Sequence, residues 1–137
     1  MKRYVVGLMF NYDFTKLVMI KKIRPDWQWG HLNGPGGQID KDETDMQAML
    51  REFKEETGVK TKPQDWTRVC TLNFEHAEVV FFAGNNDTYC DDAKTTTDEE
   101  IAAYHVIHGA LILNDKMHPV IENIPMVMAL AQQRLEV

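Results

Sequence analysis

Three glutamates in the middle of the chain, Glu52, Glu55 and Glu56, have a spacing that could place them on one side of a helix. At about 100° per residue they fall on one flank of that helix, beside its apolar stripe rather than opposite it. Like charges at i,i+4 repel each other by roughly a few tenths of a kcal/mol per pair. A divalent cation would offset this repulsion, because Mg²⁺ binds one or two carboxylates together with water and phosphate oxygens. The alternative interpretation is an ordinary solvated acidic helix face.

A glycine-rich segment directly before this helix favours the metal interpretation. The run Gly34-Pro35-Gly36-Gly37 leads into the helix, and glycines let backbone approach a ligand closely. The N-terminus of a helix also favours anions. The segment is neither a Walker loop, because no Gly-Lys-Ser/Thr follows, nor a GxGxxG loop. A glycine loop beside clustered carboxylates suits a polyphosphate that is chelated by a metal.

The helix that carries the glutamates is predicted at residues 43–57. Its apolar residues recur at i, i+3, i+4 and i+7, which is the pattern of a helix with one buried face. Gly58 is expected to end this helix as a C-cap, and Asp42 or Thr44 to cap its start. The four residues of the apolar stripe are Met46, Met49, Leu50 and Phe53.

The remaining elements form the scaffold around this helix. Runs of apolar and β-branched residues predict strands, and clusters of turn residues separate them. Residues 24–40 are expected to form a long loop, which in a compact domain usually has a function. The order of elements predicts a mixed sheet with helices packed on it. Strands are expected at 3–10, 17–20, 66–74, 76–83 and 104–107, a polar loop at 85–100, and a second helix at 120–135.

Length, composition and charge narrow the class of protein. With 137 residues of ordinary globular composition, we expect a single domain over residues 1–137. The net charge of −6 argues against a protein that binds duplex nucleic acid through bulk charge. The charge is uneven, because residues 1–39 carry +4, whereas 40–56 carry −4 and 85–100 carry −5. The two acidic blocks are the segments that could meet a common cation.

The sequence favours a cytoplasmic protein without membrane partners. No apolar run is long enough for a membrane span, and the apolar N-terminal segment is too short for a signal peptide. The two cysteines, Cys70 and Cys90, form no CxxC pair. We expect both to be free thiols, which is typical of a reducing compartment.

The residues described so far resemble the signature of the Nudix (MutT-type) hydrolase family. That signature is Gly-x5-Glu-x7-Arg-Glu-U-x-Glu-Glu-x-Gly-U, where U is a bulky apolar residue. All its specified residues match within residues 37–59, with Phe53 and Val59 at the two U positions. The resemblance implies an α/β (α+β) fold, namely an α/β/α sandwich with a mixed sheet between helices. The matching residues are Gly37, Glu43, Arg51, Glu52, Glu55, Glu56 and Gly58.

The resemblance also implies Mg²⁺-dependent hydrolysis, with Mn²⁺ as an alternative metal, and it gives the acidic residues their expected roles. The general base is either Glu52 or a downstream acid in 98–100, where Glu99 is favoured over Glu100 by its spacing to the strand at 104–107. An ordinary acidic loop is the alternative for 98–100. The implied metal ligands are the carbonyl of Gly36 and the carboxylates of Glu52, Glu55, Glu56 and Glu99.

Other residues of the motif are expected to support these acids. By resemblance, Arg51 orients a glutamate and completes an expected catalytic set with Glu52, Glu55 and Glu99. Glu43 is expected to support the junction of loop and helix. Gly37 and Gly58 are expected to be structural positions at the two ends of the motif.

Substrate contacts are implied less specifically. Residues 32–37 resemble the entry to the motif in members that clean nucleoside triphosphates, where Asn33 would contact the base or only supply a turn. Lys22 and Arg24 would meet phosphates or be ordinary strand-end cations. The ADP-ribose type has a proline where this chain has Phe74. Phe74 therefore argues against that type and is retained as a candidate substrate contact.

The expected function is hydrolysis of a (deoxy)nucleoside triphosphate, including oxidised purine forms, to the monophosphate and pyrophosphate. Dinucleoside polyphosphates, nucleotide sugars and capped RNA 5′ ends are alternative substrates. A non-catalytic Nudix-fold module that senses a nucleotide is the alternative outside the enzymes, although such modules usually lose motif glutamates. The expected partner is a small-molecule nucleotide, and the sequence leaves monomer or homodimer open.

Overall fold

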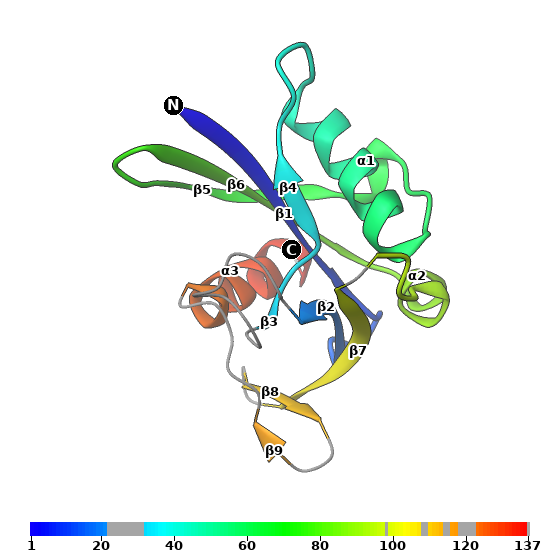
Figure 1. Cartoon of the computed structure of the whole chain (residues 1–137). Helices are drawn as coiled ribbons and strands as arrows, with labels where there is room; N and C mark the ends of the chain where they lie inside the picture. Colours follow the sequence, from blue (N-terminus) through cyan, green and yellow to red (C-terminus); the bar gives the residue numbers. More distant parts are fainter. Residues whose placement is uncertain (22–31, 98, 108–109, 114–115, 118–122, 137) are drawn as a thin grey trace.

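The structure is a computed structural model that describes residues 1–21, 32–97, 99–107, 110–113, 116–117 and 123–136. Helices pack on a β-sheet (Figure 1). The strands are β1 Lys2–Phe10, β2 Lys16–Lys21, β3 Leu32–Asn33, β4 Gly36–Gln38, β5 Thr67–Asn73, β6 Ala77–Asn85, β7 Glu100–Ile107, β8 Ala110–Leu113 and β9 Lys116–Met117. The helices are α1 Asp45–Thr57, α2 Asp87–Asp92 and α3 Ile124–Glu136, and a 3-10 turn spans Pro63–Asp65.

Strand β1 lies at the centre of the sheet. It pairs in parallel with β6 along its whole length, and antiparallel with β2 and β4 on its other edge. The described strands follow the order β5-β6-β1-β2-β7-β8-β9, with β3 on β2 and β4 on β1. The sheet is therefore mixed, as the sequence predicts.

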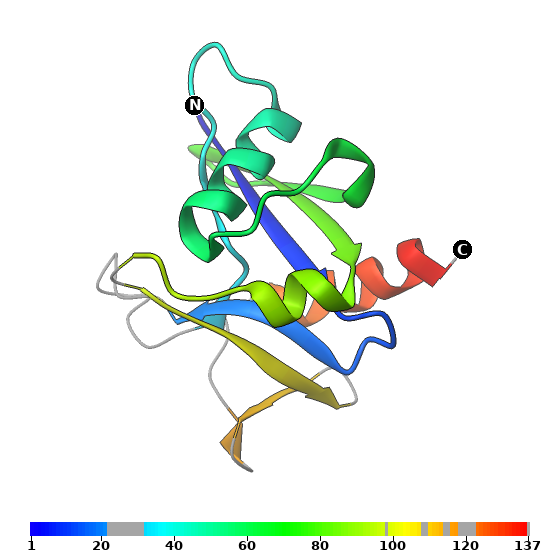
Figure 2. The ribbon, with the colours of Figure 1, turned by 90° about the vertical axis from the view of Figure 1, so that its right-hand side faces the viewer.

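The sheet is covered on both faces, which confirms the predicted sandwich. Helices α1 and α2 lie on one face and α3 on the other, so that β1 runs between α1 and α3 (Figures 1 and 2). Successive side chains of a strand point to opposite faces, and β1 therefore contributes to both cores. Val6, Leu8 and Phe10 pack on the α3 side, and Val5 and Met9 on the α1 side.

The glycine segment crosses the sheet where β1 and β2 diverge. Strand β1 pairs with β2 near its end, with Phe10 opposite Leu17, while β4 pairs with the first half of β1. The chain leaves β3 on β2, passes Pro35 and joins β1 as β4. The carbonyl of Pro35 accepts a hydrogen bond from the amide of Gly7 over 2.8 Å. The start of the motif is thus held against the middle of the sheet, in contact with α1.

Helix α1 is capped at both ends by residues that the sequence singles out. Thr44, one of the two predicted N-caps, accepts from the amide of Gln47, and the side chain of Gln47 returns a bond to the Thr44 backbone as a capping box. Gly58 ends the helix with φ 78°, a left-handed conformation that favours glycine. Both caps fix the length and position of the helix that carries the motif glutamates.

Two predicted loops contain regular structure, and one strand is longer than expected. The segment 85–100 includes α2, which Asn86 begins by accepting from the amide of Tyr89 over 2.9 Å, and which buries Cys90. The predicted loop 24–40 includes β3 and β4, and its residues 24–31 lie outside the described residues. Strand β7 begins at Glu100 rather than at 104, because pairing with β2 extends it. Helix α3 begins at Ile124, with Pro125 in its first turn.

The remaining expectations concern the membrane and the cysteines. Among the residues that the structure describes, no helix has the length and apolar character needed to cross a membrane. Cys70 and Cys90 are both free thiols, which confirms the prediction for them. Burial in the α1-side core raises the pKa of Cys90 to about 12.

Candidate active site

Arg51 on α1 connects the residues of the motif. Its Nε and Nη2 atoms donate to the two carboxylate oxygens of Glu43 over 2.7 and 2.9 Å, which is a bidentate contact. Nη1 donates to Oε1 of Glu52 over 2.8 Å, and Nη2 also reaches the carbonyl of Gln38 over 3.0 Å. Arg51 is therefore in a position to orient Glu52. Through its contact with Glu43 it also links the loop before α1 to the helix.

The Arg51–Glu43 pair has a clear electrostatic consequence. The hydrogen bonds from the guanidinium hold the pKa of Glu43 below its usual range, despite the opposing effect of burial. The same contacts, with those to Glu52, raise the pKa of Arg51. Both groups therefore stay charged, and Arg51 stays aimed at the helix carboxylates.

Glu56 is the most buried of the motif glutamates. Only 7% of it is exposed, and its Oε1 accepts a hydrogen bond from the backbone amide of Gly36 over 3.0 Å. Since Gly36 begins β4 and Glu56 lies in the last two turns of α1, this bond joins the glycine segment directly to the helix. A carboxylate buried at such a position is unusual for a solvated acidic face, which argues against that interpretation of the motif helix.

Gly37 packs against the carboxylate of Glu52. A Cβ added at Gly37 would lie 2.5 Å from Cδ of Glu52, and closer still to its Oε1. Real Cβ atoms essentially never come that close, so any larger residue would displace the glutamate. Glycine at this position therefore lets the carboxylate of Glu52 keep its place, and Glu52 and Glu56 face adjacent residues of the glycine segment.

Glu55 differs from its two neighbours. Its side chain is 57% exposed and its Oε2 lies 3.4 Å from Nη1 of Arg51. Within the described ranges, no three His, Cys, Asp or Glu side chains converge closely enough to hold a metal ion between them. Among the described residues, the carboxylate oxygens of Glu52 and Glu56 meet at the glycine segment. This set fits Mg²⁺, which takes one or two protein carboxylates and completes its shell with water and phosphate.

The segment that precedes the downstream acids contacts the C-terminal end of α1. The amide of Lys94 donates to the carbonyl of Thr57 over 3.0 Å, and Thr96 donates to the carbonyl of Glu55. Glu99 is half-buried and follows this contact by three residues. Glu100 is exposed and begins β7.

The predicted substrate contacts are brought together only in part. Asn33 lies in β3 and its Oδ1 accepts from the amide of Gly34 over 2.8 Å, which is the turn role of the two alternatives. Phe74 is 49% exposed and lies in the turn between β5 and β6. None of the contacts described for it joins Phe74 to the motif. Lys22 and Arg24 lie outside the described residues.

Three residues at this site were not predicted from the sequence, and only one of them lies in a recognisable sequence pattern. The carbonyl of Gln38 holds Arg51 through backbone, which any residue offers. Asp40 lies 3.7 Å from Nη2 of Arg51 and is one of several acids in its block. Thr96 contacts the end of α1, and the run of three threonines at 95–97 was the available signal.

Comparisons with known proteins agree with this fold. A family model described as NUDIX domain matches residues 1–124. A MutT/nudix family protein from Enterococcus faecalis has a TM-score of 0.79 at 16% identity, covering 97% of this chain, which spans 61% of that chain's length. A MutT structure from work on Aliivibrio salmonicida and Vibrio cholerae has a TM-score of 0.70 at 21% identity, covering 96% of this chain and 98% of that chain. A MutT NUDIX hydrolase from Burkholderia pseudomallei has a TM-score of 0.70 at 17% identity, covering 93% and 95%.

The structural likenesses, at these identities, establish the fold, and the family model establishes membership. No curated protein matches the sequence. The chain belongs to the Nudix family, a family of hydrolases that act on pyrophosphate bonds.

Proposed function

We propose that this chain hydrolyses a (deoxy)nucleoside triphosphate, oxidised purine forms included, to the monophosphate and pyrophosphate in a Mg²⁺-dependent reaction. The observation that carries the proposal is the contact of adjacent glycines with two motif carboxylates. The amide of Gly36 bonds Glu56, and Gly37 leaves room for the carboxylate of Glu52. Backbone that close to fixed carboxylates suits a phosphate group that shares a cation with them.

Each residue of the site has a stated task in the proposed reaction. Glu52, Glu55, Glu56 and Glu99 would hold the cation together with the carbonyl of Gly36. When bound, the cation would supply positive charge to the phosphate oxygens. Arg51 holds Glu52 in one orientation through its 2.8 Å hydrogen bond. Either Glu52 or Glu99 takes the proton from the attacking water.

The position of Glu99 supports it over Glu100 as the downstream acid. Glu99 is half-buried in the bend before β7, three residues after Thr96, whose hydroxyl donates to the carbonyl of Glu55 at the end of α1. Glu100 is exposed, begins β7 and pairs across the strands with Lys21.

The substrate class is tested with purified protein, Mg²⁺ and a panel of nucleotides. The panel contains canonical and oxidised triphosphates, ADP-ribose, a dinucleoside polyphosphate, a nucleotide sugar, NADH and a capped RNA, with the phosphate products identified in each case. We expect the triphosphates to have the largest kcat/KM and to release pyrophosphate. A preference for any other member of the panel would overturn the triphosphate assignment while leaving pyrophosphate-bond hydrolysis intact.

The same panel separates an enzyme from a nucleotide-sensing module. Absence of turnover on every compound, with Glu56→Gln binding nucleotides like the wild type, would favour the module. The proposal includes action in the cytoplasm, which the two free thiols support, because a reducing compartment keeps cysteines unpaired.

A further inference from the structure

The threonine run, residues 95–97, uses all three of its exposed hydroxyls in hydrogen bonds. Thr96 Oγ1 donates to the carbonyl of Glu55 in the last turn of α1. Thr95 Oγ1 accepts from the amide of Ile101 over 3.0 Å. These bonds join the segment before β7 to both the motif helix and its own strand. Each of the three hydroxyls therefore has a hydrogen-bond partner within the protein, although exposed hydroxyls could bond to water instead.

The end of α1 leaves a backbone acceptor for this segment. The last four carbonyls of a helix have no donor within the helix. The amide of Val59, which could otherwise continue the helical pattern to Glu55, donates instead to Oγ1 of Thr57 over 3.2 Å. The carbonyl of Glu55 is taken by Thr96, and that of Thr57 by the amide of Lys94 over 3.0 Å. The segment 94–96 therefore completes the C-terminal end of the motif helix.

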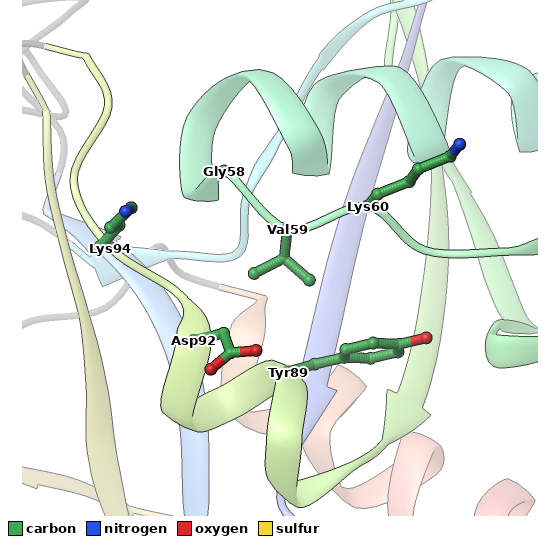
Figure 3. Close-up of a pocket in the computed structure, with 6 residues that line it drawn as sticks. All are labelled: Gly58, Val59, Lys60, Tyr89, Asp92 and Lys94. Carbon is green, nitrogen blue, oxygen red and sulfur yellow. The ribbon is translucent and has the colours of Figure 1, made fainter.

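Figure 3 shows this junction beside a surface cavity of about 350 Å³. The chain that leaves α2 runs past the C-terminal end of α1, where Lys94 lies next to Gly58. The cavity between the two helices is lined by Gly58, Val59, Lys60, Tyr89, Asp92 and Lys94. The segment that leads from α2 to Glu99 therefore runs alongside the C-terminal end of the motif helix.

Glu99 lies between two anchored points. Thr96 precedes it by three residues, and Ile101, whose amide is held by Thr95, follows it by two. Three residues span at most about 11 Å even when fully extended. The amide of Glu99 itself donates to the hydroxyl of Thr97 over 3.3 Å. The backbone of Glu99 is therefore confined near the turn of α1 that carries the motif glutamates.

We propose that Thr96 is a positioning residue, which fixes the segment carrying Glu99 against the last turn of α1 and thereby sets metal affinity and the rate of hydrolysis. The inference rests on the proposed function, in which Glu99 serves the same site as the motif glutamates. Thr95 supports the same loop from the strand side. Thr96 acts through its hydrogen bond to the backbone of α1.

The test compares Thr96→Val, which keeps the shape and removes the hydroxyl, with Thr96→Ser, which keeps the hydroxyl. Thr71→Val is the matched control, because Thr71 is an exposed threonine on β5. The readouts are Mn²⁺ affinity by EPR titration, kcat and KM for the best triphosphate, and the melting temperature. We expect Thr96→Val to weaken Mn²⁺ binding and to lower kcat, each by about tenfold, with KM nearly unchanged. Thr96→Ser and Thr71→Val are expected to match the wild type.

A double-mutant cycle distinguishes positioning from general stability. If Thr96 acts through Glu99, then adding Thr96→Val to Glu99→Gln causes no further loss of kcat. A full additional loss in the double variant would overturn the proposal. So would wild-type Mn²⁺ affinity and kcat in Thr96→Val, or a Thr96→Ser variant as impaired as Thr96→Val.

The failure of this inference is distinguishable from the failure of the proposed function. If the wild type hydrolyses no nucleotide, the proposed function fails, and the Mn²⁺ titration of the same variants still decides the role of Thr96. If Thr96→Val lowers the melting temperature too far to be assayed, Thr95→Val releases the loop from its other end and is expected to weaken Mn²⁺ binding in the same direction. Unchanged Mn²⁺ binding in Thr95→Val would then count against the proposal.

Discussion

The two 13-residue helices of this protein cover opposite faces of one sheet and bury different kinds of residue. Helix α3 buries Ile124, Val127, Met128 and Ala131, which are spaced i, i+3, i+4 and i+7 and are all apolar. Helix α1 buries an apolar set as well, but it adds Glu56 and Thr57 to it. The α3 face is an ordinary amphipathic contact, whereas the α1 face combines a core with a polar site.

In α1 the face that is buried does not coincide with the apolar stripe of the sequence. Its apolar stripe predicts a buried face centred on Met46, Met49, Leu50 and Phe53, yet Met46 and Leu50 are only half-buried. The residues actually buried are displaced by about 45° toward the flank of Glu52 and Glu56. The bonds from Arg51 to Glu52 and from Gly36 to Glu56 draw this flank inward. The helix that carries the motif thus departs from ideal amphipathicity, whereas α3 does not.

The largest expected effect is on the buried carboxylate of α1. We expect Glu56→Gln to lower kcat/KM for the best substrate by at least about 100-fold while the melting temperature changes little, because the amide keeps the shape but not the charge. Glu136→Gln makes the same substitution on the exposed surface of α3 and is expected to leave hydrolysis unchanged. Equal activity in the two variants would remove the functional distinction between the helices.

The opposite pattern is expected for the core of α3. Met128 is 1% exposed, so Met128→Ala should lower the free energy of unfolding by about 2–5 kcal/mol through lost burial and the cavity left behind. Chemical denaturation measures this loss, and kcat per folded molecule should stay at the wild-type value. A large fall in kcat below the unfolding transition would mean that the α3 face also shapes the site.

A smaller effect is expected at the arginine of the motif. Arg51→Lys keeps the positive charge but loses the bidentate contact with Glu43 and the separate bond to Glu52, so we expect a fall in kcat of about tenfold. Arg134→Lys on α3, at an exposed position, serves as the matched control. Steady-state kinetics of both variants measures the difference. Identical kinetics would show that charge alone, without orientation, suffices at residue 51.

The smallest expected effect is on the pH dependence of the free energy of unfolding, through the pair of Arg51 on α1 and Glu43. Because the pKa of Glu43 lies below its ordinary value of 4.5 in the folded protein, its pairing with Arg51 stabilises the fold above about pH 4.5 and is lost as the pH falls through the lowered pKa. Urea unfolding between pH 6 and 3 should therefore show a shallower loss of stability in Glu43→Gln than in the wild type. The same slope in both proteins would contradict the importance of this pair.

The fold was predictable where local patterns and burial agree. The strands β1, β2, β5 and β6 and the helix ending at Gly58 follow from periodicity and turn residues. The start of β7 was not predictable, because its first residues are strand only through pairing with β2. Helix α2 was missed because its six residues are mostly polar and depend on the Asn86 cap and on the burial of Cys90.

The candidate site was predictable in its motif and not in its surroundings. The spacing of Glu52, Glu55 and Glu56 identified the helix flank, yet it gave the three equal weight, whereas the structure buries Glu56 and exposes Glu55. That asymmetry comes from the path of β4, which tertiary pairing with β1 determines. The contact of Thr96 with Glu55 joins segments 41 residues apart, which no local pattern encodes.

The metal-holding role of the α1 face is tested most directly by titrating the protein with Mn²⁺ and following the free ion by EPR. We expect the wild type and Glu136→Gln to bind Mn²⁺ with equal affinity, with Mg²⁺ competing for the same site. Glu56→Gln is expected to bind Mn²⁺ at least about tenfold more weakly. Wild-type Mn²⁺ affinity in Glu56→Gln would contradict the assignment of this face as the metal site.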